Sequence, residues 1–252
     1  MKNWQKTTHL VLIFALVLLF SVAPLNTTQA KSPRQLREVV FIHYKLPPEL
    51  TPAKGGNKPI AACTLTTNDD INDYGLTGWY MPSDGLAYQI NISTLPDNLN
   101  VNDFINAIDK ATNTWTQADN SQQWSYGGTT NVRRSRLDGV NLVSFGGASG
   151  GIAVTRTWYW TDTHEVAESD ITFASNMAWS ISNANNGDCG GAAGTYDVQD
   201  IATHEFGHQV GLVDLYSSAD KDLTMYGYGV TTELKKDSLG TGDVSGALAV
   251  AP

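Results

Sequence analysis

The segment that decides the fold reads His204-Glu205-Phe206-Gly207-His208-Gln209-Val210-Gly211-Leu212-Val213-Asp214. It continues a predicted helix over 197–210 that Asp197 can cap. Side chains four residues apart project from the same helix face, so His204 and His208 can reach one metal ion. Glu205 lies beside them, where its carboxylate can take a proton from a water that the metal acidifies. The pattern predicts a zinc centre.

The residues after the helix supply a candidate third ligand. Gly211 can adopt the left-handed conformation that ends a helix and turns the chain sharply. Asp214 would then return to the metal, and a carboxylate is an accepted zinc ligand. His164 is the alternative, because His9 and His43 fall outside the expected domain.

Hydrophobic periodicity extends this pattern outward. Residues 101–116 carry apolar side chains at spacings of three and four, which indicates an amphipathic helix with Asn100 or Asn102 as its cap. Strands are predicted at 86–92, 124–132, 140–145, 151–160 and 170–173. No repeat or second domain is indicated, so one catalytic domain is expected over 60–252.

The N-terminal region reads as export and leader sequence. Lys2 and Lys6 precede an apolar run, and Ala30 ends a small-x-small cleavage site, so residues 1–30 are predicted to be a signal peptide of a secreted protein. A retained membrane anchor is the alternative, although the run is short for a spanning helix. Residues 31–59 are rich in Pro and Gly and read as a leader or short pro-segment, with 39–42 as one strand or a piece of that segment.

Composition limits the partners. Cleavage after Ala30 would change the formal net charge from -9 to -11, because Lys2 and Lys6 leave and no acid does. Contacts with phosphate need clusters of Lys and Arg, so neither nucleic acid nor a stable association with membrane is expected. We also expect a monomer.

The chain has two cysteines, Cys63 and Cys189. In an oxidising compartment a disulfide between them is the first expectation. Two free thiols are one alternative. A latency switch, in which a cysteine of the leader occupies the zinc, is the other.

Together these motifs resemble those of the metzincins, zinc proteases with a methionine turn after the zinc helix. Asp214 in the last ligand position is similar to the snapalysin-type proteases, and the rest of the chain looks matrixin-like. Leu223-Thr224-Met225-Tyr226-Gly227 resembles the methionine turn, and Asp243 to Gly246 resembles the start of the C-terminal helix. The resemblance implies an α/β fold of the zincin type: a twisted mixed β-sheet, a backing helix and an active-site zinc helix.

The resemblance also implies a function, a zinc metalloendopeptidase that cleaves extracellular proteins with Glu205 as general base. The alternative is a non-catalytic zinc-containing binding module of the same fold. Asp170, Ile171, Thr172 and Phe173 would form the edge strand that pairs with substrate, and residues 226–230 would form a pocket wall. Calcium would suit the Asp- and Gly-rich loops, but no complete calcium-loop pattern supports it.

Three departures from the family pattern stand out. Asp214 replaces the usual His. Gly227 stands where some relatives carry a zinc-binding Tyr. The sequence around Cys63 lacks the matrixin pro-segment motif, which disfavours the latency switch.

Overall fold

A computed structural model describes residues 34–50, 71–182 and 191–250. The predicted signal peptide, Cys63 and Cys189 lie outside these residues, so the cysteine pairing stays a prediction. Within the described ranges, every helix is too short or too polar to cross a membrane.

Among these described residues, a mixed sheet of seven strands forms the framework, in the order β3-β2-β4-β6-β5-β1-β9. Neighbours are parallel from β3 to β6, β5 is antiparallel to both β6 and β1, and β9 is parallel to β1. The strands are β1 (Leu36–Lys45), β2 (Leu86–Ile90), β3 (Trp124–Thr129), β4 (Asn141–Gly146), β5 (Ala153–Trp160), β6 (Val166–Ala174) and β9 (Tyr228–Gly229). A second small sheet joins β7 (Trp179–Ser180) and β8 (Tyr196–Asp197). The expected mixed α/β sheet is thereby confirmed.

In the part of the chain that the structure describes, three α-helices accompany the sheet: α1 (Val101–Ala118), α2 (Val198–Val210) and α3 (Thr241–Ala249). The side chain of Asn100 accepts hydrogen bonds from two main-chain N–H groups of the first turn of α1, and Asp197 does the same for α2. These caps stabilise helix starts that would otherwise leave N–H groups unpaired. Short 3-10 turns are η1 (Pro48–Leu50), η2 (Ile92–Thr94), η4 (Ser218–Asp220) and η5 (Lys235–Asp237).

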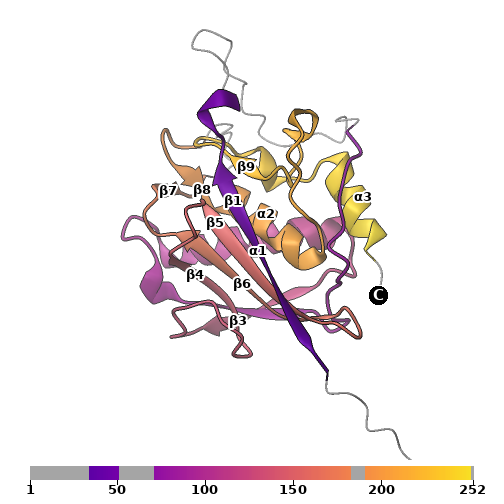
Figure 1. Ribbon diagram of the computed structural model, residues 1–252. Helices are drawn as coiled ribbons and strands as arrows, with labels where there is room; N and C mark the ends of the chain where they lie inside the picture. Colours follow the sequence, from indigo (N-terminus) through magenta and orange to yellow (C-terminus); the bar gives the residue numbers. More distant parts are fainter. Residues whose placement is uncertain (1–33, 51–70, 183–190, 251–252) are drawn as a thin grey trace, which may run out of the picture. The chain divides into compact units, whose positions relative to one another are not determined.

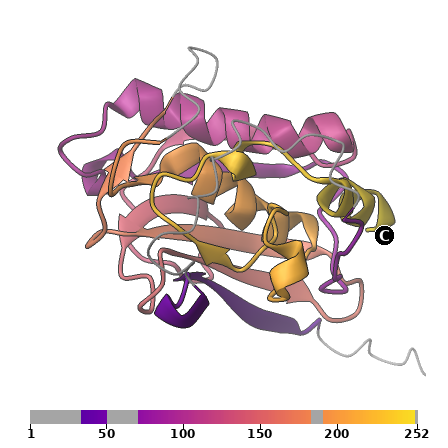
Figure 2. The same ribbon diagram turned by 90° about the horizontal axis from the view of Figure 1, so that it is seen from above.

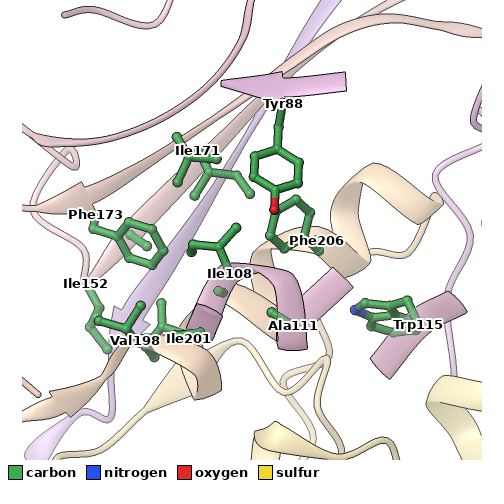
Figure 3. Packing of buried hydrophobic residues seen from close by; sticks show 14 of the residues in the cluster. Tyr88, Ile108, Ala111, Trp115, Ile152, Ile171, Phe173, Val198, Ile201 and Phe206 are labelled. Atoms are coloured by element: carbon green, nitrogen blue, oxygen red, sulfur yellow. The ribbon is translucent and has the colours of Figure 1, made fainter. Parts of the chain in front are cut away.

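The main core lies between the sheet and the two long helices. Figure 3 shows Ile171 and Phe173 of β6 with Ile108 of α1 and Ile201 of α2, all of them buried. Tyr88, Ala111, Trp115, Ile152, Val198 and Phe206 belong to the same cluster. Packing of its apolar residues against α1 therefore fixes the position of α2. The two helices lie side by side in Figure 2.

Strand β1 begins the sheet earlier than the sequence predicted. Its ten residues belong to the segment assigned to the leader, yet they pair with β5 from Leu36↔Trp160 to His43↔Ala153 (Figure 1). The strand predicted at 39–42 is confirmed, and the boundary near Ile60 does not mark the start of the sheet. Removal of residues 31–59 from the mature protein stays a prediction.

Candidate metal centre

The two histidines of α2 present their Nε2 atoms to a common point. His204 and His208 are fully buried. Nδ1 of His204 lies 2.7 Å from the carbonyl oxygen of Thr224, and Nδ1 of His208 lies 2.8 Å from that of Leu212. A carbonyl only accepts, so both Nδ1 atoms carry a proton and Nε2 is the ring atom left to bind a metal. Burial, aided by the nearby ammonium of Lys236, lowers the pKa of His204 to about 4 and keeps this ring neutral.

The turn after α2 delivers Asp214 to the same point. Gly211 has φ 122°, and a Cβ there would lie 2.6 Å from the carbonyl oxygen of Trp79. The turn thus requires glycine, as the sequence predicted. Oδ1 of Asp214 lies 3.0 Å from Nε2 of His204 and 3.6 Å from Nε2 of His208.

Unpartnered atoms mark this point as a cation site. Nε2 of His204, Nε2 of His208 and Oδ1 of Asp214 are buried and have no hydrogen-bond partner. Buried polar atoms without partners destabilise a fold by about 1–3 kcal/mol each, so the convergence of these three atoms fits a bound cation. Two imidazoles and a carboxylate are a donor set that suits Zn²⁺. His164 belongs to neither group of candidate metal ligands found among the described residues.

Glu205 lies beside this set. Its Oε2 accepts a 2.6 Å hydrogen bond from the Thr155 hydroxyl of β5, and its Oε1 has no hydrogen-bond partner. Burial raises the pKa of Glu205 to about 7. One oxygen is thus fixed by the sheet and the other is free to exchange a proton. Thr155 went unnoticed in the sequence because its role depends on a contact between β5 and α2.

Met225 packs against α2 at Gly207, which lies between the two histidines in the sequence. A Cβ built at Gly207 would approach its Sδ to 2.2 Å, so α2 presents bare backbone to the methionine. The turn that carries Met225 is held by Asp243, whose carboxylate accepts from the N–H groups of Met225 at 3.0 Å and of Thr224 at 2.8 Å. The turn thus packs against α2 at Gly207, and its Thr224 accepts a hydrogen bond from His204.

Comparison with known proteins agrees with this geometry. The family model described as Matrixin matches residues 79–250. The chain belongs to the matrixin family. A search of curated proteins found no match. The family is one of zinc metalloproteases, which agrees with the donor set and the fold.

One departure from the matrixin pattern has a structural counterpart. A Cβ at Gly227 would lie 2.5 Å from the ring of Tyr216. The hydroxyl of Tyr216 donates a 3.2 Å hydrogen bond to Oδ2 of Asp214. A tyrosine therefore reaches the centre of this matrixin from the turn after α2, and the bare Gly227 makes room for its ring. No motif in the sequence indicated that Tyr216 would contact Asp214.

The predicted substrate-pairing strand is wrong. Asp170, Ile171, Thr172 and Phe173 lie in β6, which is paired on one side with β4 and on the other with β5. Both rows of its main-chain groups are occupied, so this strand cannot bind a peptide. The strand beyond it is β5, which bears Thr155 and is itself covered by β1.

Strand β1 also brings a third histidine to the centre. Nδ1 of His43 lies 3.4 Å from Oε1 of Glu205, and its ring centroid lies 3.9 Å from that of His204. The ring of Phe41 stacks on His208 at 4.0 Å with 8° between the planes. The sequence placed His43 in the leader, because only the pairing of β1 with β5 reveals its position.

Proposed function

We propose that this matrixin is an exported zinc endopeptidase that hydrolyses internal peptide bonds of extracellular proteins. His204, His208 and Asp214 would hold the zinc ion, and Glu205 would serve as general base. The observation that carries the proposal is the convergence of three buried, unpartnered ligand atoms next to an unpartnered carboxylate oxygen.

Glu205, Thr155 and Asp214 would each have a separate role in catalysis. Zinc, when bound, would polarise the peptide carbonyl and acidify the attacking water. Oε1 of Glu205 would take a proton from that water and later give it to the leaving amine. Thr155 would keep the carboxylate oriented through its hydrogen bond to Oε2. Asp214 would fix the two imidazoles and add a negative charge to the metal site.

The direct test uses the form recovered from the culture medium, after sequencing of its N-terminus. We expect about one zinc per chain and cleavage of casein that a chelator abolishes. Glu205→Gln should retain the zinc and lose activity by about 100-fold or more, whereas Asp97→Asn, at an exposed position before α1, should behave as wild type. Full activity of Glu205→Gln would refute the mechanism. Zinc binding without cleavage of any protein or peptide would favour a non-catalytic binding module.

A further inference from the structure

The centre is closed in this structure. The side chains of His204, Glu205 and His208 are fully buried, and only 8% of the Asp214 side chain is exposed. No substrate can reach these groups while they are covered. The cover over the two imidazoles is β1, through the rings of Phe41 and His43.

Strand β1 lies over the centre as an extended peptide bound by its main chain. On one side it pairs with β5 in antiparallel fashion, and Ile152 N–H donates to the carbonyl of His43 at 2.7 Å. On the other side Tyr44 N–H donates to Gly227 O at 3.2 Å, where β1 runs parallel to β9. Main-chain pairing of this kind is how extended peptides add to sheet edges.

The direction of successive groups locates the bond that crosses the centre. Carbonyls along a strand alternate in direction, so with the His43 carbonyl turned to β5, that of Ile42 faces the opposite side. That side holds a hollow whose lining includes Ile42, Asp214 and Tyr216. The bond between Ile42 and His43 therefore lies where a cleaved bond would lie, and His43 takes the position just after it.

The side chain of His43 fills a closed pocket. It is fully buried, and a Cβ at Gly229 would lie 3.1 Å from its Nε2. At the end of the pocket Nζ of Lys236 donates a 3.0 Å hydrogen bond to this Nε2. The same Nζ donates to the carbonyls of Tyr226 at 2.7 Å and Tyr228 at 3.1 Å.

Lys236 is itself fully buried. Its ammonium group has three N–H donors, and each has a partner. Two partners are main-chain carbonyls of the pocket wall, and the third is supplied by whatever occupies the pocket.

We propose that β1 is an internal occupant of the substrate cleft, and that the pocket of His43 receives the substrate side chain just after the cleaved bond and favours one that accepts a hydrogen bond from Lys236. This inference rests on the proposed peptidase function and adds the substrate class. Gln, Glu and His carry an acceptor at a suitable reach, whereas Leu and Met would leave one buried N–H of Lys236 unpaired. A site built to hydrogen-bond its ligand rejects analogues without the partner, so we expect a preference of about tenfold or more.

The experiment uses the full chain with the recognition sequence of a specific protease inserted between Lys54 and Gly55, after β1. Peptide turnover is measured before the cut and again after the cut and removal of the fragment by gel filtration. We expect turnover to rise by at least about tenfold on release of β1. Equal turnover before and after would overturn the assignment of β1 as the occupant.

The same cut protein is offered peptides that differ only in the residue after the cleaved bond. Gln, Glu and His should be favoured over Leu and Met. Lys236→Met should abolish or reverse this order, while Lys235→Met, whose ammonium pairs with Glu233 outside the pocket, should keep it. If Lys236→Met does not fold, the order of peptide turnover by the wild-type protein decides. Turnover of the Leu peptide equal to or faster than that of the Gln, Glu and His peptides would overturn the pocket assignment.

Binding provides a second measurement that needs no turnover. The cut Glu205→Gln protein should bind fluorescently labelled peptides in the same order of affinity, measured by polarisation. Failure to cleave any peptide by zinc-loaded cut protein would count against the proposed function, whereas cleavage without the preference would remove this inference alone.

Discussion

Gly207 allows α2 to lie directly on Met225, and Gly207→Ala tests that packing. In an exposed helix this change stabilises by about 1 kcal/mol. Here the added Cβ would lie 2.2 Å from Sδ of Met225 and 2.7 Å from Cζ2 of Trp115. The indole of Trp115 cannot retreat easily, because its Nε1 donates a 2.7 Å hydrogen bond to Thr203 O.

The expected sign is therefore the reverse of the helix propensity. Overpacking a filled core costs about 1–3 kcal/mol, and two contacts under 3 Å place this site in the upper half of that range. After subtraction of the propensity gain of about 1 kcal/mol, the net loss should be about 1–2 kcal/mol. For a domain of this size that lowers Tm by roughly 2–8 °C. Zinc affinity should fall as well, because His208 lies one residue from the displaced backbone.

Urea unfolding in the presence of a chelator separates stability from zinc binding, which a competing chromophoric chelator reports. The matched control is Gly147→Ala, at an exposed glycine with nothing within 4 Å of the added Cβ. That variant should stay within about 0.5 kcal/mol of wild type. A Gly207→Ala protein as stable as wild type or more stable would show that Met225 does not pack against α2 as described.

Three further substitutions probe the surroundings of the centre. Asp243→Ala should lower the free energy of unfolding by about 3 kcal/mol or more, measured with urea, since three main-chain N–H groups lose their acceptor; a loss under about 1 kcal/mol would contradict this. Tyr216→Phe removes the hydroxyl that donates to Asp214, so zinc affinity should fall about tenfold in chelator competition with stability unchanged; unchanged affinity would show that the hydroxyl does not orient the ligand. Burial and the nearby carboxylate of Asp197 raise the pKa of Asp237 to about 8 from 3.8, so ionisation destabilises the fold as pH rises through this window. Asp237→Asn should therefore raise Tm little near pH 4 and increasingly up to pH 8, and a gain independent of pH would refute the assignment.

Local sequence was enough to predict most helices and strands, and the two histidines that can bind the metal. The spacing of His204 and His208 and the cap Asp197 follow from helix geometry within one segment. Gly211 was readable because a sharp turn with positive φ selects glycine. The α1 helix was likewise predicted from its helical periodicity, and the strands β2 to β5 from runs of strand-forming residues between turn-rich segments.

The strand order and the other residues around the metal centre depend on contacts between segments that are distant in the sequence. Which strand lies at the sheet edge depends on partners far apart in the chain, so the order of β6 and β5 could not be read from either strand, and Asp170 to Phe173 were placed wrongly. Tyr216, Thr155 and Lys236 act through side chains that meet only after the turn, the sheet and α2 have packed. The sequence determined the residues that can hold and use a metal ion, because their spacing lies within one helix and one turn. Tertiary structure alone decided that His43 and β1 cover them, because an extended strand has no preferred partner until another strand offers its unpaired main-chain groups.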